Sequence, residues 1–283
     1  MDNFLAGMFN WVIETIFALT GATASQLEIT QTSINFVAEI WDYFILLGLG
    51  LTVVYFIIDL NKKWMFEGQN LSLKTMMLPF FKLIIAVIVM ANAGWLFGAL
   101  CSFSNGFARF LEGLSIGNSL TPNVNDVGGT MIKQFGFWEK IIMLFPLIIG
   151  FAVSVVCNLV WAYKALVYKI ELVVRVAFAP VALADVYSGM NASAIKFIKG
   201  TLALILYGGC LIIIPKLTLA VGADNFLNMM DEISTTVASA DFVTKTSNVF
   251  NVILSWIGLI ICPIAGIGLT GAAKTITKEA LGA

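Results

Sequence analysis

The sequence predicts an all-α polytopic membrane protein with about five transmembrane helices, its N-terminus outside and its C-terminus in the cytoplasm. The first observation is composition: 59% of the residues are hydrophobic and 12% are charged, whereas a typical soluble domain is about 45–50% apolar and about 25% charged. The second is a series of long uncharged stretches, and the third is the uneven distribution of basic residues between them. Together they indicate an integral membrane protein.

Two segments make up the predicted domain plan. Residues 1–40 are expected to form an outer-face amphipathic helix and loop, and residues 41–283 a single integral membrane domain. Within the first segment, residues 3–20 place large apolar side chains at helical spacing, which is typical of a helix lying on the outer leaflet. A helix packed on the bundle or on a partner subunit fits the same pattern. Residues 20–35 are rich in Thr, Ser and Gln and predict a loop.

The spans follow from the intervals between charged side chains, because a transmembrane helix needs about 20 mainly apolar residues. The predicted spans lie near residues 41–60, 79–103, 141–163, 200–221 and 249–271. The first and fourth intervals are short, but charged side chains at helix ends can reach the membrane interface. Outer loops are expected at 104–138 and 222–246, the second with a short helix around 226–233.

Residues 165–185 are apolar but carry Lys169, Glu171 and Arg175. The remaining uncharged stretch is too short to cross a bilayer, so the segment predicts a re-entrant or interfacial helix and not a sixth span. Glu171 and Arg175 are four residues apart, with the acid first, and on a helix they face each other. Together with Pro180 they form a candidate site, either as a pair that holds this helix or as the lining of a hydrated vestibule.

The distribution of basic residues favours five spans over six, because cytoplasmic loops carry an excess of Lys and Arg. With five spans, 11 of the 16 basic residues lie on the inner side. They are Lys62, Lys63, Lys74, Lys82, Lys164, Lys169, Arg175, Lys196, Lys199, Lys274 and Lys278. A sixth span would place the last four of these outside and the acidic segment 223–245 inside.

Two stripes of small or polar residues recur at intervals of four and are candidates for helix packing or subunit contact. The first is Gly94, Gly98 and Ser102, and the second is Gly150, Ser154 and Asn158. Small residues let helix backbones approach closely in membranes. Packing within the subunit and contact between subunits both remain open. Asn92, like Asn158, is expected to face protein and not lipid.

The amino-acid composition argues against several classes of function. Histidine is absent, which removes imidazole acid–base relays, Ser-His and Cys-His pairs, and imidazole metal ligands. The four cysteines show no C-x-x-C spacing, so neither a zinc site nor a disulfide framework is indicated. The net charge of -1 gives no basic surplus for binding nucleic acid. We expect no catalytic residue, no cofactor and no metal, and hence not an enzyme.

Residues 176–185 (VAFAPVALAD) and 187–200 (YSGMNASAIKFIKG) carry a family resemblance. They resemble the central motif of the TrbL-like polytopic inner-membrane subunits of type IV secretion and conjugation systems. In that family an Ala/Leu-rich segment with a central Pro precedes a small-polar turn and then a basic-aromatic start of the next span. Here Pro180, Ser188-Gly189 and Lys196-Phe197 take these places, and Lys199-Gly200 stands where the family would place a tryptophan.

The resemblance implies a channel or platform subunit of a machine in the bacterial cytoplasmic membrane that contributes to DNA or protein translocation and pilus assembly. It implies a homo-oligomeric ring beside cytoplasmic ATPases, pilin and outer-facing scaffold proteins, with no cofactor and no active site. An independent small-solute transporter or ion channel subunit is the alternative. The absence of a central Asp or Glu in any span weakens a pump or an ion-coupled carrier.

Overall fold

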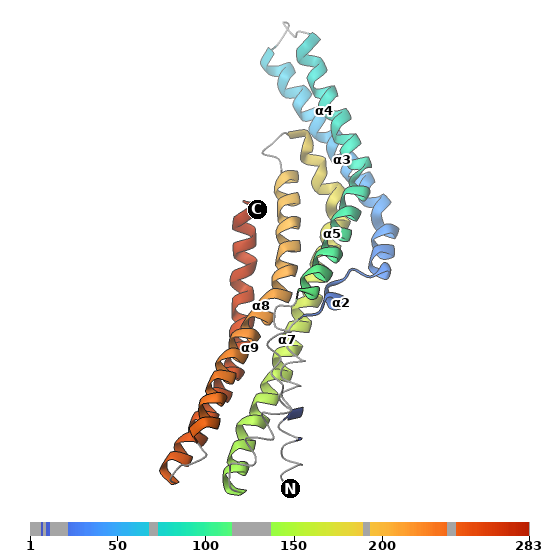
Figure 1. Cartoon of the computed structure of the whole chain (residues 1–283). Helices are drawn as coiled ribbons and strands as arrows, with labels where there is room; N and C mark the ends of the chain where they lie inside the picture. The colour runs from blue at the N-terminus through green and yellow to red at the C-terminus, as the bar shows by residue number, and fades with distance from the viewer. Residues whose placement is uncertain are drawn as a thin grey trace. The chain divides into compact units, whose positions relative to one another are not determined.

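The computed structural model of the chain is almost entirely helical (Figure 1) over residues 7, 10–11, 22–67, 73–114, 137–188, 193–236 and 242–282, which are the ones it describes. Its elements are α2 (Ala24–Leu27), α3 (Gln31–Glu67), α4 (Leu73–Ala91), α5 (Ala93–Gly113), α7 (Phe137–Leu183), the 3₁₀ helix η2 (Ala184–Ser188), α8 (Ser193–Thr236) and α9 (Phe242–Leu281).

The chain divides into two compact units, which are described separately below. Unit 1 comprises Met1–Gln26, Phe110–Ala165 and Gly209–Ala273. Unit 2 comprises Leu27–Arg109, Leu166–Gly208 and Lys274–Ala283. Each unit combines residues from several parts of the chain, and the predicted boundary at residue 40 stays a prediction.

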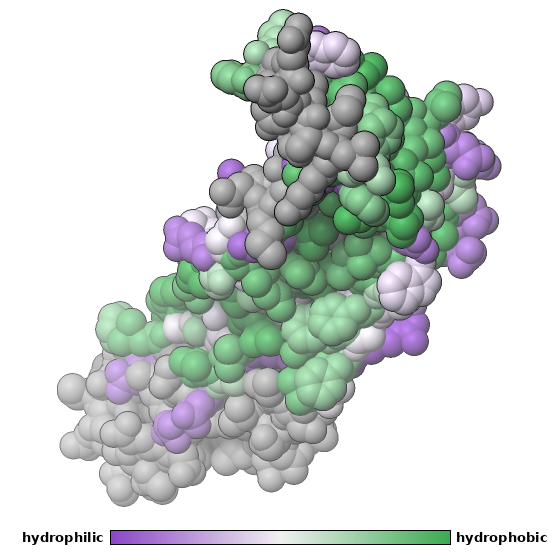
Figure 2. All heavy atoms as spheres, turned by 90° about the horizontal axis from the view of Figure 1, so that it is seen from above, coloured by the Kyte–Doolittle hydropathy of each residue, from purple (hydrophilic) through white to green (hydrophobic). Residues whose placement is uncertain are grey.

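A multi-pass membrane protein is confirmed at the level of its helices. Within the described residues, four helices are long and apolar enough to cross a membrane, or five if the bent pair α4–α5 counts as one span. Four of the five predicted spans each lie within one helix, and the second, 79–103, runs from α4 across Asn92 into α5. Apolar side chains cover much of the face that Figure 2 shows, and in α3 Leu46 is 71% exposed. Such surface is stable only when lipid or another apolar surface covers it.

The helix expected at 165–185 is not a separate element. α7 runs without interruption over 47 residues, so the predicted third span and the predicted re-entrant or interfacial segment are two parts of one helix. The charge of Lys164 does not end the helix, because its Nζ donates to the carbonyl oxygen of Ile267, at 2.8 Å, and to the Thr270 hydroxyl, both in α9. No glycine or proline lies between residues 151 and 179 to interrupt α7.

Other loops expected from the sequence are also helical. α8 continues to Thr236, so the predicted short helix at 226–233 is part of one 44-residue helix and the loop at 222–246 is much shorter. α5 extends to Gly113 into the loop predicted at 104–138, of which residues 115–136 lie outside the described residues. Long apolar helices simply continue where the turn residues are too few to stop them.

The N-terminal segment differs from its expected loop. Residues 3–20 lie outside the described residues apart from 7, 10 and 11, so the amphipathic helix stays a prediction. Residues 20–35 contain α2 and the start of α3. Thr30 immediately precedes α3, where its carbonyl oxygen accepts from the Ser33 amide at 3.0 Å and its hydroxyl lies 3.1 Å from that of Ser33. The Asn105 side chain accepts from the backbone amide of Ile29 at 3.1 Å.

The predicted second span is bent by 46° between α4 and α5, at Asn92. The Asn92 side chain donates to the carbonyl oxygen of Ile88 at 2.8 Å, on its own helix. A side chain that binds the preceding turn often bends a helix. Asn92 is exposed on the chain, which differs from the expected packing against protein.

The core of unit 2 combines α4, α5, α7, η2 and α8. It consists of Met90, Ala93, Phe97, Ala179, Leu183, Ala184 and Ala194, all buried. α3 joins it through a close backbone approach, because a Cβ added at Gly48 would lie 2.6 Å from the carbonyl oxygen of Pro180 in α7. Pro180 is thereby buried at the crossing of α3 and α7. α3 also packs against α4 and η2.

Candidate functional site

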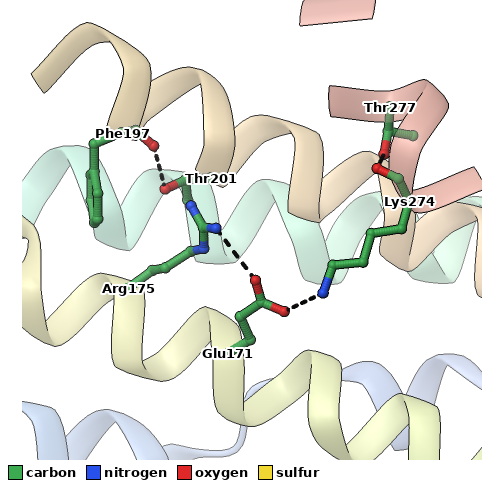
Figure 3. Close-up of polar contacts among 6 residues, drawn as sticks. All are labelled: Glu171, Arg175, Phe197, Thr201, Lys274 and Thr277. Carbon is green, nitrogen blue, oxygen red and sulfur yellow. Dashed lines mark hydrogen bonds and ion pairs between the residues drawn. The ribbon is translucent and has the colours of Figure 1, made fainter. Parts of the chain in front are cut away.

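The candidate site lies in unit 2, where three charged side chains from two helices meet (Figure 3). Glu171 and Arg175 lie on α7, and Lys274 lies near the end of α9. The Glu171 carboxylate accepts from Arg175 Nη2 at 3.3 Å and from Lys274 Nζ at 2.9 Å. The predicted pair therefore forms, and it acquires a third member 103 residues away in sequence that spacing could not reveal.

α8 supplies the aromatic and small residues around this cluster. The Arg175 guanidinium lies 6.0 Å from the centre of the Phe197 ring, and Lys274 Nζ lies 5.7 Å from that of Tyr207. Both distances suit a cation–π attraction. A Cβ added at Gly200 would lie 2.9 Å from Arg175 Nη1, so the absence of a side chain there makes room for the guanidinium.

The electrostatics of the cluster indicate a structural or binding role. Glu171 is 28% exposed, Arg175 23% and Lys274 39%, so the charges are neither fully solvated nor sealed off. The cluster contains one carboxylate and two cations, so it carries a net positive charge. Among the described residues no group of three or more His, Cys, Asp or Glu side chains lies close enough to hold a metal ion.

Pro180, the third member of the predicted site, lies elsewhere in unit 2. It packs against Gly48 of α3 and is not among the residues lining the hollow around Glu171 and Arg175. That hollow is instead completed by Tyr207, Thr277 and Lys278 among others. The predicted trio thus separates into a charged pair and a helix-crossing residue.

A second polar cluster ties the end of α3 to α4 and η2. The Tyr187 hydroxyl donates to the Asp59 carboxylate at 2.9 Å. Lys63 Nζ and Lys82 Nζ lie 3.9 Å and 4.0 Å from the same carboxylate oxygen, and Lys82 also lies 5.5 Å from the centre of the Tyr187 ring. Nothing in the local sequence singles out Tyr187, and Asp59 stands out only as the charge that ends an uncharged interval.

A buried hydrogen bond joins α5 to α7 in the same unit. The hydroxyl groups of Ser104 and Tyr168 lie 2.7 Å apart, and both residues are buried. The Tyr168 ring lies directly against α8 at Gly208, where an added Cβ would be 2.6 Å from Cζ. Nothing in the local sequence distinguishes Gly208 from the neighbouring Gly209.

The two small-residue stripes have different surroundings. Gly94, Gly98 and Ser102 line a cavity of about 690 Å³ between α3, α5 and α7 of unit 2. A Cβ at Gly94 would lie 3.6 Å from the Trp41 ring, and one at Gly98 would meet nothing within 4 Å. In unit 1, by contrast, Gly150 and Ser154 are buried and Asn158 is half-buried.

Lys216 of unit 1 caps a helix end. Its Nζ donates to the carbonyl oxygens of Leu111, Glu112 and Leu114, at 3.3, 2.6 and 3.3 Å, where α5 ends. A cation at the C-terminus of a helix satisfies carbonyl groups that lack a partner and balances the helix dipole. This contact gives Lys216 a defined partner at the end of α5.

Comparison with known proteins identifies no relative of this chain. No protein-family model matches the chain, no curated protein matches it, and no solved structure matches it.

Proposed function

We propose that this protein is a channel or platform subunit of a type IV secretion (conjugation) machine in the bacterial cytoplasmic membrane, where it contributes to DNA or protein translocation and pilus assembly. The observation that carries the proposal is a multi-pass helical chain whose small-residue stripe on α5 lines a cavity that its own helices leave unfilled at Gly98. A helix of another subunit can pack against such a face, because small residues let helix backbones approach closely in membranes.

The open face has the composition of a helix-packing surface. Gly94, Gly98 and Ser102 are all exposed on the chain, and Trp95 beside them is 76% exposed. Helices associate in membranes through close van der Waals packing at small residues, because lipid is as apolar as the side chains it would replace. A second copy of the chain is the proposed occupant, which gives a homo-oligomeric ring.

The resemblance at residues 176–200 supports the secretion-machine context. Its central Pro180 lies at the end of α7 against α3, and its basic-aromatic pair, Lys196-Phe197, opens α8. The motif therefore forms the connection between two long helices, and Phe197 packs on the core of unit 2. Residues 189–192 of the motif lie outside the described residues.

The proposal is tested by deleting the gene in its host and measuring plasmid or effector transfer. We expect transfer to fall to background and to return with the wild-type chain. A tagged chain isolated in mild detergent should form a homo-oligomer and bring a secretion ATPase, pilin and scaffold proteins with it. A lone monomer together with undiminished transfer would contradict the proposal, and solute flux by the purified chain alone would favour the transporter alternative.

A matched pair of variants separates the ring from general effects of added bulk. Gly98→Leu fills the open face on α5, and Gly50→Leu adds the same side chain on α3, where a Cβ also meets nothing within 4 Å. We expect the first to reduce oligomer and transfer and the second to leave both unchanged. Equal behaviour of the two variants would remove the argument for an α5 interface.

A further inference from the structure

Basic residues gather in unit 2 where α8 begins and α9 ends. Lys196 and Lys199 lie on the first turns of α8, and Lys278 lies on the last turns of α9; all three are exposed. Lys199 Nζ is 3.6 Å from the position of a Cβ on Gly282, and Lys278 lines the hollow that Glu171 borders. Figure 1 shows the two helix ends side by side.

The charge balance of this group is positive. It contains Arg175, Lys196, Lys199, Lys274 and Lys278 against Glu171, Asp185 and Glu279. Glu171 already accepts from Arg175 and Lys274, and the Asp185 carboxylate accepts from the Ser193 amide at 2.8 Å. The three exposed lysines make no ion pair with a residue that the structure describes, so their charge is available to a ligand.

The group lies at the ends of membrane-length helices. The apolar stretch of α8 begins at Ser193, and that of α9 ends at Leu281. Exposed apolar side chains lie on the same helices, with Ile276 61% exposed on α9 and Val174 47% exposed on α7. Cations next to exposed hydrocarbon are the arrangement found at a membrane interface, where headgroup and acyl chain meet.

We propose that these basic residues bind the phosphate headgroup of an anionic phospholipid, with Lys199 and Lys278 as the principal contacts. Glu171 acts as a positioning residue that holds Arg175 and Lys274 beside them. Lysine ammonium groups bind phosphate as point charges, and basic residues clustered at the ends of membrane helices attract anionic headgroups. The inference goes beyond the proposed function, because it requires a membrane but no secretion partner.

A lipid fits this surface better than a nucleic acid strand does. Binding of single strands combines a basic groove with exposed aromatic rings on which bases stack. Here Tyr207 is buried and Phe197 is half-buried beneath Lys274 and Arg175. The exposed apolar side chains on the same helices, Ile276 and Val174, suit acyl chains and would gain nothing from a polynucleotide.

The test uses the full chain in mild detergent, titrated with phosphatidylglycerol or with phosphatidylcholine of the same acyl chains, with bound lipid counted by native mass spectrometry. We expect phosphatidylglycerol to bind more tightly. Each lysine near the surface contributes roughly fivefold to the affinity for an anionic headgroup, so K199Q/K278Q should weaken phosphatidylglycerol binding about 25-fold. K278Q alone should weaken it about fivefold.

Two controls make the result specific. K199R/K278R keeps both charges at the same positions and should bind within about twofold of the wild type. K62Q removes an exposed charge elsewhere in unit 2 and should change nothing. The proposal is overturned by equal affinity for the two lipids, by unchanged binding in K199Q/K278Q, or by loss of single-stranded DNA binding in that variant while phosphatidylglycerol binding persists.

Discussion

Gly208→Ala tests how tightly α7 and α8 pack in unit 2. A Cβ at residue 208 would lie 2.6 Å from Cζ, 2.7 Å from Cε2 and 2.8 Å from the hydroxyl oxygen of Tyr168. The ring cannot easily withdraw, because Tyr168 is 2% exposed and its hydroxyl is hydrogen-bonded to Ser104 at 2.7 Å. The substitution must therefore move a helix or break that hydrogen bond.

The expected magnitude follows from three contributions. Overpacking a well-packed core costs about 1–3 kcal/mol, and loss of a buried hydrogen bond costs about 1 kcal/mol. The better helix propensity of alanine offsets about 1 kcal/mol. We expect Gly208→Ala to lower the free energy of unfolding by about 2 kcal/mol, measured by denaturant titration in mixed micelles with tryptophan fluorescence.

The control for Gly208→Ala is Gly50→Ala. Gly50 lies in α3, and a Cβ there meets nothing within 4 Å, so we expect a neutral or slightly stabilising effect from propensity alone. Tyr168→Leu removes the ring that clashes, so the double variant Gly208→Ala/Tyr168→Leu should be more stable than the sum of the single effects implies. Strict additivity, or wild-type stability of Gly208→Ala, would refute the packing argument.

The remaining predictions concern the other contacts of unit 2. Gly48→Ala should destabilise the protein at least as much as Gly208→Ala does. The added Cβ would lie 2.6 Å from the Pro180 carbonyl oxygen, and a backbone atom cannot rotate away as a side chain can. A melting temperature equal to that of the wild type would contradict this prediction. Glu171→Gln leaves two partly buried cations without their carboxylate and should cost about 1–2 kcal/mol, an effect that should shrink in high salt. Tyr187→Phe should lower the free energy of unfolding by about 1–2 kcal/mol through the lost hydrogen bond to a carboxylate, whereas Tyr43→Phe, at a side chain 75% exposed, should change it by less than about 0.5 kcal/mol.

Charge spacing predicted the helices of this chain well and their ends poorly. Four predicted spans each lie in one helix of the structure and the other lies in the bent pair α4–α5, because a long uncharged apolar stretch is stable in a bilayer only as a helix with its backbone bonds satisfied. The ends were misplaced where a charge was taken as a stop. Lys164 does not end α7, since carbonyl and hydroxyl groups of α9 accept its hydrogen bonds.

The candidate site was only half accessible to sequence reasoning. The Glu171–Arg175 pair is local, because a spacing of four brings two side chains to one face of a helix. Its third member, Lys274, comes from another helix, as do the aromatic rings of Phe197 and Tyr207. Such partners depend on how the helices pack, which residue spacing along one segment does not encode.

By itself, the sequence determined a helical, multi-pass membrane protein, because composition and the distribution of charges act through the solvent and need no tertiary contact. Only the tertiary structure decided which glycines matter: Gly48 and Gly208 each meet a neighbouring helix, whereas Gly98 faces an open cavity. The physical reason is that a glycine has the same local chemistry everywhere, and its importance depends on the atoms that another part of the chain brings to it.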